Sequence, residues 1–181
     1  AEELWACTTC GACMEECPVL IDHIPAITDM RRHLVLSEGK PPKQASESLE
    51  ATMQDGNPWG YPKSDRLKWA VDAGLELSTL AEKKEVDVLY WVGCAGAYDP
   101  RNQNIAQSVV KILKAARVDF AVLGKEESCS GDSARRLGEE YLFETLVQGN
   151  ITILGKYKFN TVITACPHCF HTLSNEYPDF G

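Results

Sequence analysis

Eight cysteines in two groups limit what this chain of 181 residues can fold into. The first group is compact and lies within "CTTCGACMEECP", whereas the second is spread over residues 94–169. Regular spacing of this kind favours metal binding over the disulfide framework of a small secreted domain. A reducing, cytosolic setting follows from that interpretation. The two groups are Cys7, Cys10, Cys13 and Cys17, and Cys94, Cys129, Cys166 and Cys169.

The first group has the spacing C-x2-C-x2-C-x3-C-P, the run that binds iron–sulfur clusters in bacterial-type ferredoxins. Small residues such as Gly11 and Ala12 let the backbone approach a cluster closely. Zinc motifs rarely combine three such steps with a following proline. The run therefore predicts a 4Fe–4S cluster, with structural zinc as the alternative.

The fourth cysteine of this run usually binds a neighbouring cluster, and the first cluster then takes its fourth thiolate from a second copy of the run. This chain has no second copy and does not begin with Met. We therefore expect a fragment in which Cys7, Cys10 and Cys13 share their cluster with an upstream run. The alternative is that Cys17 closes its own cluster.

The chain divides into three parts. Residues 1–39 form the predicted ferredoxin-like segment, residues 40–85 a connector with short helices, and residues 86–181 a cysteine-rich domain. In the last part, apolar strands alternate with amphipathic helices, which predicts a small parallel sheet. The expected fold class is α+β or α/β: a helical ferredoxin-like segment followed by a small α/β domain.

Two helices of the cysteine-rich domain are predicted in enough detail to be tested. Apolar residues at helical spacing in residues 101–116 are expected to turn Ile105 and Ile112 toward the core. A long helical region is expected over residues 133–154.

Each cysteine of the second group follows a predicted strand. Cys94 follows the first strand, Cys129 the second, and Cys166 with Cys169 the third. Parallel strands end at the same edge of a sheet, where α/β proteins build their sites. Pro167 suits the first turn of a helix, which would place Cys166 at the positive end of that helix and stabilise its thiolate. We therefore expect a four-thiol site, which suits one 4Fe–4S cluster.

The stretch Cys166-Pro-His-Cys169 supports a second interpretation. It is similar to the active site of thioredoxin-fold disulfide oxidoreductases, in which a thiol of low pKa drives exchange. Such an enzyme would leave Cys94 and Cys129 without a role. The four-thiol site is therefore favoured, and a redox dithiol is the alternative.

Charge and hydropathy exclude several functions. A net charge of −8 and a pI near 5.0 argue against nucleic acid as a partner. No apolar run approaches the roughly 18 residues of a membrane helix, and no signal peptide is visible. Neither a nucleophile–base pair nor a G-x-G-x-x-G loop is present, so we predict no catalytic residue and no flavin or nicotinamide site.

The stretches "VGCAGAYDP", "EESCSGDSARRLGEEYLFETL" and "TACPHCFHTL" resemble the cysteine-rich CCG domain of the heterodisulfide reductase catalytic subunit. This family includes the iron–sulfur subunits of glycolate, lactate and anaerobic glycerol-3-phosphate oxidoreductases, and electron-transfer-flavoprotein:quinone oxidoreductases. The first cysteine group, with "CPVLIDHIPAITDMRRHLV", resembles the second of two ferredoxin runs that precede that domain.

The resemblance implies an iron–sulfur electron-transfer subunit of a membrane-associated oxidoreductase, with a 4Fe–4S cluster at each cysteine group. Electrons would pass between a flavoprotein or electron-transfer flavoprotein and a membrane cytochrome b or quinone-reactive subunit. The expected location is the cytoplasmic face of the membrane, reached through a partner or an upstream segment. The alternatives are a heterodisulfide or thiol–disulfide reductase at the second site and a zinc-stabilised interaction module.

Ser130 departs from the family motif, which carries adjacent cysteines where this chain has Cys129-Ser130. The strongest disulfide-cleaving members use five thiols, so the four thiols here favour electron relay. We expect the Ser130 hydroxyl to donate a hydrogen bond to a cluster sulfur or a cysteine. His168 is interpreted as a residue that tunes the cluster or as a solvated loop residue. Arg135 and Arg136 are expected to offset cluster charge, to dock an acidic partner, or to form a solvated helix start.

Overall fold

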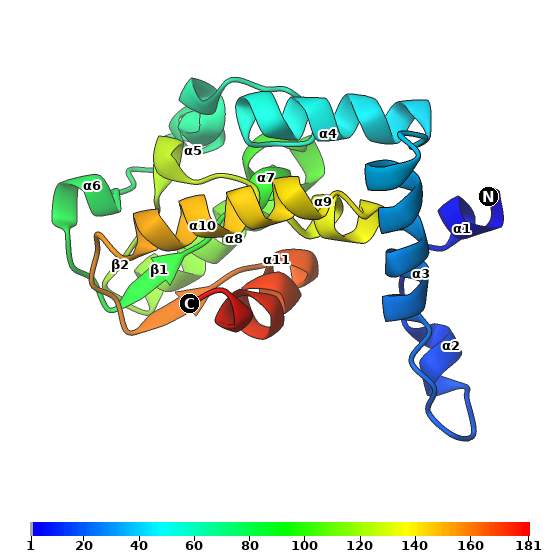
Figure 1. Cartoon of the computed structure of the whole chain (residues 1–181). Coiled ribbons are helices and arrows are strands. Elements are labelled where there is room, and N and C mark those ends of the chain that lie inside the picture. Colours follow the sequence, from blue (N-terminus) through cyan, green and yellow to red (C-terminus); the bar gives the residue numbers. More distant parts are fainter. Residues whose placement is uncertain (1) are drawn as a thin grey trace.

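Residues 2–181 are described by a computed structural model of the chain (Figure 1). Three short parallel strands form its sheet in the order β2-β1-β3. They are β1 (Val88–Tyr90), β2 (Phe120–Ala121) and β3 (Thr161–Ile163). The central strand β1 is buried at every position, because helices cover both faces of the sheet. The parallel sheet and the surrounding helices confirm the predicted fold class.

The side chains around β1 alternate between two hydrophobic layers, as the pleat of a strand requires. Tyr90 packs with Val110 of α8 (Pro100–Ala115). Leu89 packs in a second layer, against which the end of α10 (Glu140–Leu154) lies. Each face of the sheet therefore has its own core.

The strand order follows from two crossovers. The first passes from β1 through α7 (Gly93–Tyr98) and α8 to β2. The second passes from β2 through η3 (Gly124–Glu126), α9 (Asp132–Leu137) and α10 to β3, on the far side of β1. The chain then continues through α11 (Pro167–His171), η4 (Thr172–Glu176) and η5 (Tyr177–Asp179).

The connector lies along one side of this domain. It contains α4 (Lys43–Asp55), η2 (Lys63–Leu67), α5 (Lys68–Asp72) and α6 (Leu80–Lys83). Trp69 of α5 is buried in the same core layer as Tyr90, which fixes the connector to the sheet domain.

The N-terminal helices form an arm beside the domain. They are α1 (Glu2–Ala6), α2 (Ala12–Glu15) and α3 (Ile24–Arg32), which continues into the π-helical turn η1 (His33–Ser37). Figure 1 shows α3 standing next to α9, with α2 at the end of the arm away from the sheet.

Buried Arg31 of α3 joins this arm to the domain. Its guanidinium donates to the backbone carbonyls of Leu4 and Cys7 in the arm. It also donates to the carbonyl of Arg136 in α9, over 2.9 Å. One side chain therefore holds the Cys7 segment, α3 and the cysteine-rich domain together.

The long helix expected over residues 133–154 is interrupted at Gly138, between α9 and α10. Gly138 has a φ of +83°, and a Cβ at this position would collide with the backbone of Arg31 and Arg32. The predicted helical region is therefore present, with a break that the close approach of α3 requires and that helical spacing alone does not reveal.

The inward face of α8 also differs from the prediction. Ile105 and Ile112 are 45% and 65% exposed, whereas Ala106 and Val110 are buried. Small residues face the sheet here because α7 and the connector pack closely against the helix. Within residues 2–181, none of the helices combines the length and the hydropathy needed to cross a bilayer.

Candidate metal centre

The second cysteine group lies at the carboxyl edge of the sheet. Cys94 is in the first turn of α7, directly after β1, and Cys129 is in the loop after β2. Cys166 caps the N-terminus of α11 after β3, and Cys169 is one turn further on. The strand order β2-β1-β3 places a topological switch point between β1 and β3, where α/β sheets bind ligands.

The four thiols occupy one shared region of the structure. Cys94 contacts Cys129, and Cys166 contacts Cys169. The thiol of Cys169 also interacts electrostatically with those of Cys94 and Cys129. A Cβ built on Gly93 would lie 3.2 Å from the sulfur of Cys169, so the β1 and β3 loops approach closely. The structure thus brings the thiols together, and their role as ligands remains a prediction.

The chemistry of this donor set suits a cluster, because four thiolates can each bind a different iron of a 4Fe–4S cluster. Within residues 2–181, no three His, Cys, Asp or Glu side chains are arranged to hold a single metal ion. A buried cation beside the thiols, Arg66, also fits a negatively charged group.

The helix start at α11 favours the thiolate form of Cys166. A hydrogen bond from Cys169, together with the backbone N–H groups of Cys169 and His168, lowers the pKa of Cys166 to about 5. The same contact, with burial, raises the pKa of Cys169. Contact with Cys129 and burial raise the pKa of Cys94, whereas Arg66 acts in the opposite direction. Thiolates are the form that binds metals, so the lowered pKa of Cys166 is compatible with its predicted role as a ligand.

Ser130 makes the expected hydrogen bond. Its buried hydroxyl donates to the sulfur of Cys169 over 3.5 Å. The loop around it is fixed by Tyr177, whose hydroxyl donates to the Ser130 carbonyl over 2.9 Å. Asn150 of α10 donates to the carbonyl of Cys129 over 2.9 Å and to the Tyr177 hydroxyl over 2.9 Å. The backbone that carries Cys129 is therefore positioned by buried polar groups.

The sequence did not single out Arg66 and Glu127, which form a buried ion pair of 2.8 Å next to Cys94. Glu127 lies two residues before Cys129 in the sequence, and this closeness to a predicted ligand could have marked it as a site residue. Arg66 lies in the connector, far from any cysteine in sequence, so only the folded chain reveals its position.

The first cysteine group lies in the arm. Cys10 and Cys13 are exposed, and Cys7 and Cys17 are half-buried. The N–H of Ala12 and the hydroxyl of Thr8 lower the pKa of Cys10. The N–H groups of Ile21 and Val19 lower the pKa of Cys17, and the N–H of Thr9 donates to the sulfur of Cys7 over 3.4 Å. Backbone donors thus surround these thiols, as ferredoxin-type runs require. The sharing of one cluster by Cys7, Cys10, Cys13 and an upstream run stays a prediction.

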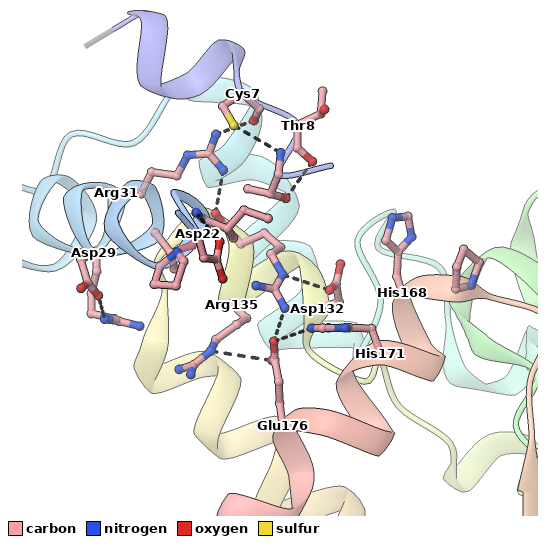
Figure 2. Close-up of a pocket in the computed structure, with 17 residues that line it drawn as sticks. Cys7, Thr8, Asp22, Asp29, Arg31, Asp132, Arg135, His168, His171 and Glu176 are labelled. Atoms are coloured by element: carbon pink, nitrogen blue, oxygen red, sulfur yellow. Dashed lines mark hydrogen bonds and ion pairs between the residues drawn. The ribbon is translucent and has the colours of Figure 1, made fainter. Parts of the chain in front are cut away.

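A cleft of about 700 Å³ is lined by Cys7 of the first cysteine group and by residues that follow Cys166 of the second (Figure 2). Cys7 is on one side of this cleft, and Pro167 and His168 are on the other. His168 is exposed, with its Nδ1 4.0 Å from the sulfur of Cys166.

The arginines of α9 line this cleft and are paired. Arg135 forms ion pairs with Glu140 and Glu176, and Arg136 pairs with Glu176 and with Asp132. They form a partly exposed ion-pair network in α9, and their roles toward a cluster or a partner stay predictions.

Comparisons with known proteins identify relatives. Residues 88–174 match the CCG family of cysteine-rich domains. The chain is 49% identical over 98% of its length to a "Probable membrane-anchored ferredoxin" of Chromohalobacter salexigens. It is 44% identical over 99% of its length to the "Probable iron-sulfur-binding oxidoreductase FadF" of Bacillus subtilis. It is 42% identical over its whole length to the "EtfAB:quinone oxidoreductase" of Syntrophomonas wolfei.

More distant relatives include a subunit of the dihydromethanophenazine:CoB–CoM heterodisulfide reductase of Methanosarcina barkeri, at 28% identity over 98% of this chain. The match covers 42% of that relative. The chain spans about a quarter of the length of the more similar relatives, 26% of each. No solved structure matches it.

Proposed function

Residues 88–174 belong to the CCG family of cysteine-rich domains, and on that premise we propose that the chain relays electrons between two 4Fe–4S clusters of an oxidoreductase. The observation that carries the proposal is the convergence of Cys94, Cys129, Cys166 and Cys169 at the switch point of the sheet. The iron–sulfur proteins among the relatives support the same cofactor type.

One cluster would be held by these four thiols, and it would supply one-electron redox chemistry. The second would be held by Cys7, Cys10 and Cys13, with a fourth thiolate from an upstream ferredoxin run. Cys17 would then bind a neighbouring cluster. In this proposal the chain's own residues hold the clusters, provide hydrogen bonds to their sulfur atoms and exclude water from the second site.

We assign the electron donor and acceptor by the same reasoning. The donor would be a flavoprotein or electron-transfer flavoprotein, and the acceptor a quinone-reactive or cytochrome b subunit, with either direction of flow. The relative named for EtfAB and quinone supports this assignment. The relative named as membrane-anchored supports a location at the cytoplasmic face of the membrane, through a partner or a segment outside these residues.

The test is metal analysis of the anaerobically purified protein, with EPR after reduction. We expect iron and acid-labile sulfide in equal amounts. Cys94→Ser should remove the signal of the second cluster and keep that of the first, and Cys13→Ser should do the reverse. Stoichiometric zinc without sulfide would instead establish a zinc-stabilised interaction module. Reduction of the clusters by a reduced electron-transfer flavoprotein, followed by stopped-flow absorbance, tests the donor.

Disulfide reduction at the second site is the second candidate. The low pKa of Cys166, about 5, favours it, as does the likeness to heterodisulfide reductase subunits. Ser130 in place of the second adjacent cysteine speaks against it. Turnover of a heterodisulfide by the reduced protein, absent in Cys166→Ser, would establish this activity.

A further inference from the structure

Arg66 reaches the second cysteine group from outside the domain that carries it. It lies in η2 of the connector, yet its side chain is only 2% exposed. Its Nη2 donates to Glu127 Oε1 over 2.8 Å and lies 3.6 Å from the sulfur of Cys94. The Tyr98 ring covers one face of the guanidinium. The Cζ atom of Arg66 lies 5.7 Å from the centroid of that ring.

Glu127 fixes this arginine to the loop that carries Cys94. Its Oε1 also accepts from the N–H of Gly93 over 2.8 Å, and its Oε2 accepts from the N–H of Val92 over 3.1 Å. The carboxylate is 1% exposed. A buried carboxylate with three donors is held in one position, and it holds Arg66 there in turn.

Two nitrogen atoms of Arg66 have no protein acceptor. Its Nε and Nη1 atoms are buried and make no hydrogen bond to any residue in the range 2–181. Leaving guanidinium donors buried and unpaired is costly, so an acceptor that is not part of the described chain is required. Sulfur atoms of a cluster bound by four thiolates are such acceptors, and the cluster has the opposite charge.

We propose that Arg66 is a positioning residue that donates to the cluster held by Cys94, Cys129, Cys166 and Cys169 and sets its reduction potential. This inference rests on the proposed function, because it requires a cluster at that site. A cation beside the cluster stabilises the reduced, more negative state and raises the potential. Glu127 limits this effect, because its negative charge opposes it.

Charge and packing roles of Arg66 predict different results. Removing one partner of a buried ion pair destabilises the fold whichever role Arg66 has, so stability does not separate the roles. The sign of the change in the reduction potential of the second cluster separates the two roles. Removing the cation should make the potential more negative, and removing the carboxylate charge should make it more positive.

The experiment is an EPR-monitored redox titration of both clusters, with iron analysis, on the anaerobically purified protein. We expect Arg66→Met to shift only the second cluster, to a more negative potential. Arg66→Lys should shift it less in the same direction, because it keeps the charge and loses the forked donors. Glu127→Gln should shift it to a more positive potential. Arg117→Met, at an exposed arginine in the turn after α8, is the matched control and should shift neither cluster.

An unchanged potential in Arg66→Met with full iron content would overturn the inference, as would shifts of the same sign in Arg66→Met and Glu127→Gln. If Arg66→Met does not fold or does not load iron, the opposite signs of Arg66→Lys and Glu127→Gln decide in its place. A parent protein without a second cluster would refute the proposed function itself. That outcome is distinct from a normal cluster whose potential does not respond to Arg66.

Discussion

The hydroxyl of Ser130 lies 3.5 Å from the sulfur of Cys169 and donates a hydrogen bond to it. At this position the family motif has a cysteine, so the same point in the fold carries either a donor or a further thiolate. In the proposed four-thiol site, Ser130 has the role of a donor.

Ser130→Ala should keep the iron content of the protein and make the potential of the second cluster modestly more negative, because it removes a donor to a ligand sulfur. Ser130→Cys should change the EPR spectrum instead, because it offers a fifth thiolate. Iron analysis and EPR of both variants beside the parent test this. Loss of the second cluster in Ser130→Ala would mean that the hydroxyl is itself a ligand.

Gly93→Ala should reduce iron loading of the second site. Gly93 has a φ of +75°, and a Cβ would lie 3.2 Å from the sulfur of Cys169. Gly74→Ala is the control, since Gly74 has a similar φ of +65° and open space around its Cβ position. Each variant should lose about 1–2 kcal/mol from the left-handed backbone. Only Gly93→Ala should lower the EPR signal of the second cluster, and equal losses in both variants would contradict the steric argument.

Arg31→Met should loosen the arm. It removes donors to the carbonyls of Leu4, Cys7 and Arg136, and we expect a loss of about 3 kcal/mol in the free energy of unfolding. Hydrogen exchange should accelerate in residues 2–17. Arg32→Met is the neighbouring control, because its pairs with Asp29 and Glu140 are partly exposed and should contribute about 1 kcal/mol or less. Unchanged exchange in the arm of Arg31→Met would show that α1 is held by other contacts.

Tyr177→Phe should destabilise the loop that carries Cys129. The lost hydroxyl donates to the Ser130 carbonyl and accepts from Asn150, so the free energy of unfolding should fall by about 1–2 kcal/mol. Denaturant titration measures the change. Tyr141→Phe, at a tyrosine that is 72% exposed on α10, is the control and should have little effect. If the two variants were equally stable, contacts other than the Tyr177 hydroxyl would hold the loop that carries Cys129.

The parts of the site that sequence predicted depend on local spacing and on strand order. Cys94, Cys129 and Cys166 were expected together because each follows a strand, and parallel strands end at one edge. That inference requires only that the strands exist and run parallel, and short strands are sufficient. Ser130 was found because it differs from a cysteine in the family motif.

The parts that were missed depend on contacts between distant segments. Arg66 belongs to a connector without a recognisable motif, and its partners are 28 and 61 residues away in sequence. The break at Gly138 depends on the approach of α3, and the burial of Ala106 depends on α7. Helical periodicity identifies one apolar face and gives no information on which neighbour will pack there.

The sheet order β2-β1-β3 also bears on when this protein can acquire its cofactor. The central strand β1 is synthesised before both of its neighbours, and its second neighbour, β3, follows about 70 residues later. The last thiol of the second group, Cys169, is made after all three strands. During translation, Cys94 therefore emerges as a bare thiol well before its partners exist. Under the proposed function, a cluster held by all four thiols can be completed only after Cys169 has been made.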